Sequence, residues 1–448
     1  MQEKDAIVAS AKASSPEPLE GRREWRYVEL VPKHPNQILT MDSTRSILTV
    51  IGAVCSLFNS IGFANAFGIF QEYYRRNQLA GRSDSAISWI GSIMMFIMFM
   101  SAAPAGLLLD RIGPTPLLAA GHSALLLSVF MTSLCQKYYQ FILAQAILMG
   151  FGAGFATIPA TASVTKHFKK HRGIATGFTI AGSSLGGIIW PIMLNRLLNY
   201  DGMSFGWSVR VVGFTMIPLA ILSTSLVRAP EKPVEEKTME TEANHSVENQ
   251  TKKKSDLSVL RKPAFIFTVI GVSIFNLAMF VPFFYVTVWS TSLGHSAAFS
   301  FYLVSALNGA SLFGRVGFGA IADKFGAYNL LTITSIISAI ICFSWTTATS
   351  IGGLIAWSLA YGFLCGACLS LELQAVTTLA TPETHGTVMG LGFGSMSITG
   401  LVGTPIAGAL VPHGWIALSM YSGASLMTGA VFIVLSRLSL SRELKARV

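Results

Sequence analysis

The sequence predicts an all-α polytopic membrane protein, and three observations lead to that fold class. Hydrophobic residues make up 52% of the 448 residues and charged residues only 12%, whereas a soluble domain carries roughly 25% charged residues. Most charges gather in residues 1–45, residues 228–262 and the last dozen residues, which leaves long apolar runs between them. These runs fall into two sets of six that share sequence landmarks. A soluble enzyme is therefore excluded, and no catalytic residue is expected.

Twelve apolar runs are long enough to cross a membrane, because about 20 residues rising 1.5 Å each cover roughly 30 Å of hydrocarbon. The predicted spans are 46–70, 86–109, 115–134, 139–163, 173–195, 207–227, 264–290, 297–319, 327–347, 352–378, 387–410 and 415–436. They divide the chain into an N-terminal tail (1–45), an N-terminal six-helix half (46–227), a central loop (228–263), a C-terminal six-helix half (264–436) and a short C-terminal tail (437–448). The first tail is predicted to be disordered because it is polar, mixed in charge and contains four prolines.

The distribution of Lys and Arg predicts the side of the membrane on which each loop lies, because these residues favour cytoplasmic loops. With the N-terminus inside, cytoplasmic segments hold 25 of the 32 Lys and Arg residues, and external segments hold six. Both termini and the central loop are therefore expected in the cytoplasm, with the lipid bilayer as partner and the plasma membrane as the expected location. The same bias explains the net charge of +10, so nucleic-acid binding is not expected. The sequence does not indicate an oligomeric state.

Two segments that close the second and eighth spans share the pattern Gly-x3-Asp-Arg/Lys-x-Gly. The pattern consists of Gly106, Asp110, Arg111 and Gly113 in the first copy and of Gly319, Asp323, Lys324 and Gly326 in the second. A pair of glycines repeats with the same offset along the chain, since Gly173 and Gly177 match Gly386 and Gly390. These repeats indicate two homologous six-helix halves, an architecture found in alternating-access carriers.

The repeated pattern resembles the signature loop of the major facilitator superfamily, which implies the major facilitator fold and a role in transport. Its glycines permit close approach of helices or a tight turn. Its aspartates lie where a carboxylate can accept hydrogen bonds from the N-terminus of a neighbouring helix or pair with a basic side chain. We therefore expect the eight pattern residues to control conformation through contacts that form in one state and break in another. The first copy departs from the family at Pro114-Thr115-Pro116, where further basic residues are usual.

Residues 167–182 are similar to the helix-five signature of the monocarboxylate-transporter family. The matching residues are Phe168, Lys170, Arg172, Ala175, Gly177, Ala181 and Gly182, whereas His171 and Thr179 depart from the signature. Residues 63–74 are similar to the fungal branch of that family, although its acidic-Gly-Gly-aromatic entry to helix one is reduced to Asp42-Ser43. We expect Lys170, Arg172 and Gly177 to take part in the conformational change. The alternative is a positively charged loop followed by a helix face of small residues.

Arg315 is the most distinctive single residue, because it places a cation inside the eighth span, where an unpaired charge costs roughly 2.5–3.5 kcal/mol. It lies four residues before Gly319, and the resemblance to monocarboxylate transporters implies that an arginine at this place binds the substrate carboxylate. A guanidinium suits that task because it offers two parallel donors. The alternative is an arginine that reaches toward the cytoplasmic surface from near the end of its helix.

The acid that the family resemblance implies for proton coupling is replaced here by Ser311, one turn before Arg315. A hydroxyl does not titrate near neutral pH, so proton coupling at this position is not expected. Ser311 and Asn308, which lies about one turn earlier, are uncharged candidates for substrate contact in the same cavity. Glu372 is the only acid inside a predicted span. It is a candidate proton carrier or a partner for Arg315, because burial favours the neutral form of a carboxyl group; the alternative is a charge that faces the cytoplasmic loops.

Amide and aromatic side chains in other spans are the remaining candidates for substrate contact. Asn59 and Asn65 in the first span lie six residues apart, on roughly opposite faces of a helix, so at most one should face a given cavity. Asn276 in the seventh span is a similar candidate, and Tyr285 near the outer end of that span is a candidate for gating or stacking. The alternatives are hydrogen bonds between helices for the amides and anchoring at the membrane interface for the tyrosine.

No cofactor or metal is expected, because the His and Cys residues show no metal-ligand spacing and no phosphate-binding Gly-rich loop with Lys-Ser/Thr is present. The function predicted first is secondary-active transport of a small organic acid or related metabolite, with an anionic substrate and with proton coupling left open. One alternative is an efflux carrier that exports a biosynthetic metabolite. A second alternative is a nutrient sensor that does not transport.

Overall fold

The computed structural model describes residues 44–168, 171–199, 201–229, 257–381, 384–443 and 446. All regular elements in these ranges are helices, which confirms the all-α prediction. The predicted N-terminal tail up to residue 43, Lys170 and most of the predicted central loop lie outside the described residues. The helices belong to one compact unit, Thr40–Val448.

Each of the first six predicted spans coincides with one helix or with consecutive helices. The first span contains α2 (Thr44–Asn59), α3 (Ile61–Ala64) and α4 (Phe67–Arg76). The second and third spans are α5 (Asp84–Ile112) and α6 (Pro114–Thr132). The fourth span contains α7 (Tyr138–Phe141), a π-helix (Ile142–Leu148) and α8 (Met149–His167), and the fifth and sixth spans are α9 (Arg172–Asn199) and α10 (Phe205–Leu226).

The second six spans follow in the same way after a short 3₁₀ helix (Leu257–Arg261). The seventh span contains α12 (Pro263–Met279) and α13 (Val281–Ser292), and the eighth is α14 (Ala297–Phe325). The ninth and tenth spans are α15 (Ala327–Phe343) and α16 (Ile351–Thr378). The eleventh span contains α17 (His385–Gly394) and α18 (Met396–Leu410), and the twelfth is α19 (Trp415–Leu440).

Most of these segments satisfy the length and apolarity that a membrane span requires. Within the described residues, ten segments are long and apolar enough to cross a membrane, and α15 is a shorter apolar helix. The α14 helix has 29 residues, which is also more than the about 20 residues that a span needs. It is the helix that carries Asn308, Arg315 and Asp323.

Two glycines of the repeated pattern end the helices on which the pattern lies. Gly113 follows α5 with φ 80°, and Gly326 follows α14 with φ 89°. Residues with a side chain rarely adopt this backbone conformation, which glycine adopts freely. The chain therefore turns directly from α5 into α6 and from α14 into α15. As a result, α14 continues six residues beyond the predicted end of its span at Gly319.

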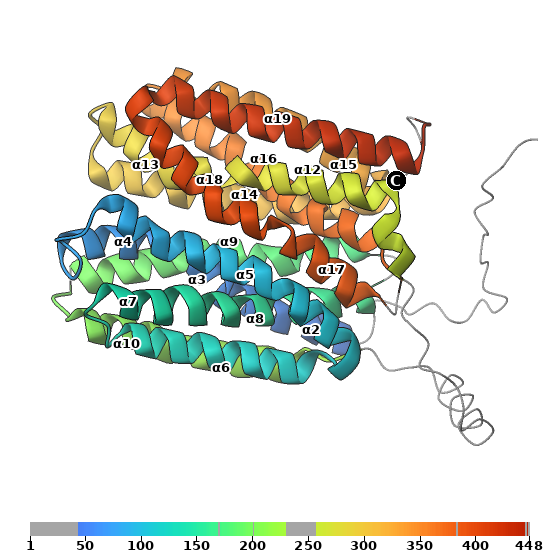
Figure 1. Cartoon of the computed structure of the whole chain (residues 1–448), viewed down its shortest axis with the longest axis horizontal. Coiled ribbons are helices and arrows are strands. Elements are labelled where there is room, and N and C mark those ends of the chain that lie inside the picture. Colours follow the sequence, from blue (N-terminus) through green and yellow to red (C-terminus); the bar gives the residue numbers. More distant parts are fainter. Residues whose placement is uncertain are drawn as a thin grey trace, which may run out of the picture. The chain divides into compact units, whose positions relative to one another are not determined.

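The two halves meet along two pairs of helices that the sequence repeat relates to each other. The α5 helix packs along α17 and α18, and α9 packs along α14. Figure 1 shows the first half in blue to green and the second in yellow to red, with α5 and α9 on the side of the first half that faces the second. Each half has its own buried apolar cluster, and a third cluster joins residues of the first half with Leu373 and Met389 of the second.

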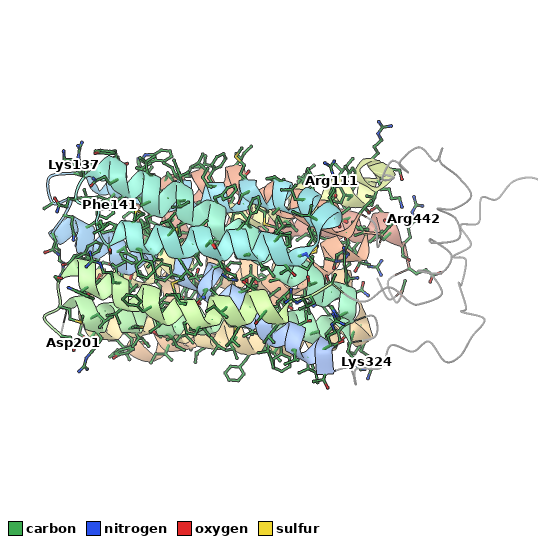
Figure 2. All side chains as sticks on the ribbon, turned by 90° about the horizontal axis from the view of Figure 1, so that it is seen from below. Arg111, Lys137, Phe141, Asp201, Lys324 and Arg442 are labelled. Carbon is green, nitrogen blue, oxygen red and sulfur yellow. The ribbon has the colours of Figure 1, made fainter. Side chains whose placement is uncertain are left out.

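The bundle has two ends, which we name by the residues that lie there. Figure 2 shows Arg111, Lys324 and Arg442 at one end, which we call the inner end. Lys137 and Asp201 lie at the opposite end, which we call the outer end. The repeated Gly-x3-Asp pattern is thus at the inner end in both halves.

Candidate functional site

Asp110 ties the first half to the second at the inner end. Its Oδ1 accepts from the backbone N–H of Gly386 (3.0 Å) and its Oδ2 from the backbone N–H of Thr387 (2.7 Å), both at the N-terminus of α17. The Thr387 hydroxyl donates to Oδ2 as well (3.0 Å), and Lys166 Nζ lies 3.3 Å from Oδ1. A carboxylate at this place satisfies helix N–H groups that have no partner within the helix.

Asp323 makes the corresponding contact from the second half to the first. Its Oδ1 accepts from the backbone N–H of Gly173 (2.7 Å) and its Oδ2 from that of Ile174 (3.1 Å), at the N-terminus of α9. The aspartates and their glycine donors are related by the same offset along the chain that the repeated pattern shows. The structure therefore shows two repeat-related contacts between the halves at the inner end.

Glycines at these contacts allow the helix backbones to approach. A Cβ added at Gly173 would lie 2.8 Å from Asp323 Oδ1, and one added at Gly386 would lie 2.8 Å from Asp110 Oδ1. At Gly319 a Cβ would lie 2.6 Å from the Gly173 carbonyl oxygen. Gly106 faces the Gly386 carbonyl oxygen in the same way on the other helix pair. The halves are thus closed against each other at the inner end in this structure.

Arg315 lies in the interior of α14 and is 3% exposed. Its Nη1 donates to the Ile180 carbonyl oxygen (2.7 Å) and to the Ser183 hydroxyl, both on α9 of the other half. Its Nε is buried without a hydrogen-bond partner. Because α14 continues ten residues beyond it, about 15 Å of helix separate Arg315 from the inner end. This position does not fit an arginine that reaches the surface from a helix end.

Three other residues predicted to contact substrate pack against the face of α9 that binds Arg315. They are Ser311, Asn308 and Asn65. The hydroxyls of Ser311 and Ser184 are 3.4 Å apart. A Cβ added at Gly187 would lie 2.7 Å from Asn308 Oδ1 and 3.1 Å from Asn65 Nδ2. The structure thus brings Asn65 of the first half close to the α14 residues of the second half.

The α9 residues at this site were missed by the sequence analysis. They are Ile180, Ser183, Ser184 and Gly187. Their spacing of three and four residues places them on one helix face. The sequence offers only Ser183 and Ser184 within an apolar span as a signal, and serines in such a span do not by themselves indicate a site.

Glu372 is also buried but does not meet Arg315. It lies in α16 and is 1% exposed, so it does not face the loops at the inner end. Its carboxyl oxygens accept from Asn276 Nδ2 of α12 at 3.3 and 3.5 Å, and the same Nδ2 donates to the Val272 carbonyl oxygen (3.0 Å). Within the described ranges, no ion pair joins Glu372 to Arg315.

Asn59 and Tyr285 make contacts within their own halves. Asn59 Nδ2 donates to the Met216 carbonyl oxygen of α10 (3.0 Å) and the residue is fully buried. The Tyr285 hydroxyl lies 3.5 Å from the Thr404 carbonyl oxygen of α18. Neither contact involves Arg315, so these two predicted residues stand apart from the polar groups on α9.

The remaining basic residues of the predicted set lie near the inner end. Arg111 and Lys324 are exposed, and Lys324 Nζ lies 5.7 Å from the centre of the Phe325 ring. Arg172 is the first residue of α9, and its Nε and Nη2 are buried without hydrogen-bond partners. Among the residues that the structure describes, no group of three or more His, Cys, Asp or Glu side chains is arranged to hold a metal ion.

Two repeated six-helix halves that enclose buried polar side chains define a membrane transporter that works by alternating access. The chain belongs to the Major Facilitator Superfamily, because the model of that family matches residues 49–378. The superfamily predicted from the repeated pattern is therefore confirmed. The assignment to its monocarboxylate-transporter-like branch stays a prediction.

Curated relatives with similar sequences come from fungi. An MFS-type transporter of Aspergillus fumigatus is 42% identical over 407 residues, which cover 90% of this chain and 94% of the relative. The agnestins efflux protein of Paecilomyces divaricatus is 43% identical over 401 residues, 89% of each chain. The aspyridones efflux protein of Emericella nidulans is 38% identical over 404 residues, which cover 89% of this chain and 79% of the relative.

A solved structure confirms the fold independently of close sequence similarity. A variant of the Escherichia coli fucose:proton symporter FucP superposes with a TM-score of 0.65 at 17% identity, covering 86% of this chain and 98% of that one. A second structure of FucP, in the outward conformation, gives a TM-score of 0.63 with the same identity and coverage. The predicted major facilitator fold is thus confirmed.

Proposed function

We propose that the protein is an efflux carrier of the monocarboxylate-transporter-like branch, and that it exports a biosynthetic metabolite with a carboxylate or similar acidic group. The observation that carries the proposal is the Arg315 guanidinium, which is buried between helices of opposite halves and keeps an unpartnered Nε. The proposal places the inner end and both termini in the cytoplasm and the carrier in the plasma membrane.

The Arg315 guanidinium has one side bound by protein and another side left for a ligand. Nη1 is held by Ile180 and Ser183, whereas the buried Nε has no partner. A carboxylate along the Nε and Nη2 edge would accept two parallel hydrogen bonds. It would also offset the roughly 2.5–3.5 kcal/mol that a cation costs inside a membrane. Because no acid in the described part of the chain pairs with Arg315, the substrate is the natural source of that anion.

Uncharged polar groups beside Arg315 suit the rest of such a substrate. Ser184 and Ser311 meet on one turn of α9, and Asn65 and Asn308 meet at Gly187 on the next turn. Hydroxyl and amide groups of this kind orient a ligand through hydrogen bonds without adding charge. We therefore assign Asn65, Ser311 and Asn308 to the substrate path, whereas the contacts of Asn59 and Tyr285 favour packing roles.

The export direction rests on the relatives and on the charge distribution. Two of the relatives, at 43% and 38% identity, are named efflux proteins. The excess of Lys and Arg at the inner end supports a cytoplasmic inner end, because these residues favour cytoplasmic loops. Substrate would then load when the inner contacts of Asp110 and Asp323 separate.

Glu372 is our candidate for the proton that drives export. Its carboxyl group is almost fully buried and, among the described residues, accepts hydrogen bonds from the amide of Asn276. Ionisable side chains inside membrane spans commonly mark ion and proton paths, and release of a proton from Glu372 would require a change of its surroundings. Because Glu372 and Arg315 do not pair, proton and anion would occupy separate sites.

The test is comparative metabolite profiling of cells with and without the gene, both inside the cells and in the medium. The proposal predicts an acidic metabolite that accumulates inside on deletion and disappears from the medium. Re-expression of the wild type should restore export, and Arg315→Ala should not. Arg196→Ala is the matched control, because Arg196 is an exposed arginine at the outer end whose partner is Asp201.

Other outcomes would favour one of the alternative functions. An organic acid that stays in the medium of the deletion strain would indicate uptake rather than export. Unchanged metabolites together with an altered transcriptional response to a nutrient would indicate a sensor. Export that Arg315→Ala leaves intact would remove the carboxylate site while keeping the efflux function.

A further inference from the structure

Within the described residues, one contact between the halves has no equivalent on the repeat-related helix pair. The offset that relates Gly106 to Gly319 also matches Arg315 of α14 with Ala102 of α5. The backbone contacts at the two places are alike, since a Cβ added at Gly177 would lie 2.5 Å from the Arg315 carbonyl oxygen and one added at Gly390 would lie 2.5 Å from the Ala102 carbonyl oxygen. An alanine is therefore enough for this backbone packing. In the described part of the chain, the Arg315 side chain adds a contact that the α9–α14 pair has and the α5–α17 pair lacks.

The added contact runs from one half to the other. Nη1 of Arg315, in the second half, donates to the Ile180 carbonyl oxygen and the Ser183 hydroxyl, in the first half. The Ser183 hydroxyl in turn donates to the Ile180 carbonyl oxygen (3.0 Å). Two acceptors on one turn of α9 thus hold a single nitrogen of the guanidinium.

This contact lies on the inner side of the α9–α14 interface. Asp323 and Gly173 meet toward the inner end, and Ser311 and Ser184 meet on the other side of Arg315. A separation of α9 from α14 that begins at the inner end and extends as far as Arg315 breaks the Nη1 hydrogen bonds. When these bonds break, the orientation of the whole guanidinium is released.

We propose that Arg315 belongs to the inner gate as well as to the substrate site, and that Ser183 is a positioning residue that ties the orientation of the anion-binding edge to closure of that gate. The hydrogen bonds of Nη1 hold the gate closed, and the edge of the guanidinium formed by Nε and Nη2 binds the anion. The second half of this inference rests on the proposed function, whereas the gate itself does not. Ser183 acts through Arg315 and does not need to touch the substrate.

The gate can be tested without a substrate, by disulfide cross-linking between the halves. Ser184 and Ser311 are suited to report on α9 and α14, because their hydroxyl oxygens are 3.4 Å apart. Ser92 and Thr404, whose hydroxyl oxygens are 3.2 Å apart, are suited to report on α5 and α18 toward the outer end. The assay uses the full-length chain with the five native cysteines replaced and one cysteine pair introduced at a time.

The variants separate a gate from general loosening of the bundle. Ser183→Ala and Arg315→Met should slow cross-linking of the 184–311 pair about three- to tenfold and leave the 92–404 pair within twofold. Ser183→Thr keeps an acceptor hydroxyl and should cross-link within twofold of the wild type. Ser163→Ala is the matched control, because Ser163 is a buried serine whose hydroxyl donates to the Pro159 carbonyl oxygen of its own helix.

The cross-linking rates decide whether Arg315 and Ser183 belong to the inner gate. Unchanged cross-linking of the 184–311 pair in Ser183→Ala and Arg315→Met would overturn the gate proposal, and so would equal slowing of both pairs. Slowing confined to the 184–311 pair would support it, even if Arg315→Ala still exported an acid in the metabolite assay. In that case the proposal that Arg315 binds a carboxylate would be wrong, whereas its role in the inner gate would be supported.

Discussion

Asp110 and Asp323 bind equivalent backbone amides in opposite directions across the two halves. Asp110 of the first half accepts from the start of α17 in the second, and Asp323 of the second half accepts from the start of α9 in the first. Each aspartate therefore stabilises a helix N-terminus that belongs to the other half. Separation of the inner end leaves both carboxylates and both helix ends without these partners.

Replacing Asp323 by Ala should weaken closure of the inner end. A carboxylate at a helix N-terminus contributes about 0.3–1 kcal/mol when exposed and up to about 2 kcal/mol when partly buried, and a shift of 1.4 kcal/mol is tenfold in an equilibrium. We expect Asp110→Ala and Asp323→Ala each to lower the export rate at least about threefold at equal surface abundance. Asp201→Ala, at the outer end, is the control. Equal export by Asp323→Ala and Asp201→Ala would contradict a gate role for Asp323.

Two glycines of α14, two residues apart, provide a sharper test of the packing between halves. A Cβ at Gly319 would lie 2.6 Å from the Gly173 carbonyl oxygen, whereas a Cβ at Gly317 would meet nothing within 4 Å. Gly319→Ala should therefore reduce export at least about tenfold. Gly317→Ala should keep wild-type export and gain up to about 1 kcal/mol of helix stability. Both effects can be measured from export rates and thermal unfolding in detergent, and an inactive Gly317→Ala would show that flexibility of α14, rather than close packing, is what export requires.

Glu372→Gln should remove the pH dependence of export. Glutamine imitates the neutral, protonated carboxyl group and cannot release a proton. We expect wild-type export to rise as the external pH falls, and Glu372→Gln to give a flat profile. The control is Glu72→Gln, because Glu72 is an exposed acid at the outer end that pairs with Arg75 and Arg76. A pH profile that survives in Glu372→Gln would exclude Glu372 as the proton site.

The fold could be predicted from the sequence because its signals are long or repeated. Apolar runs of membrane length recur twelve times, and one constant offset links the segments around Gly106 and Gly173 with those around Gly319 and Gly386. The helix ends were harder to predict. Hydropathy places the end of the eighth span at Gly319, whereas the charged residue Asp323 still belongs to α14. Only the left-handed turn at Gly326 ends α14, and that turn depends on backbone geometry rather than on hydropathy.

The candidate site was predictable only in part. A lone arginine in an apolar span stands out, so Arg315 could be found without a structure. Its partners on α9 could not, because a serine in a membrane helix usually bonds to its own backbone. The separation of Asn59 from Asn65 and the pairing of Glu372 with Asn276 depend on which helices become neighbours. A single sequence does not encode such neighbours as a local pattern.

Arg315 is proposed to bind the acidic group of the exported metabolite. The most direct measurement compares the export rate of that acid with the rate of its neutral methyl ester, in the wild type, Arg315→Ala and the control Arg196→Ala. Truncating one partner of a buried charge pair costs about 2–5 kcal/mol, so Arg315→Ala should lose at least about 30-fold in kcat/KM for the acid. The wild type and Arg196→Ala should export the ester equally slowly, and the ratio of acid export to ester export should fall only in Arg315→Ala. Equal export of the acid by the wild type and Arg315→Ala would show that Arg315 does not bind the acidic group.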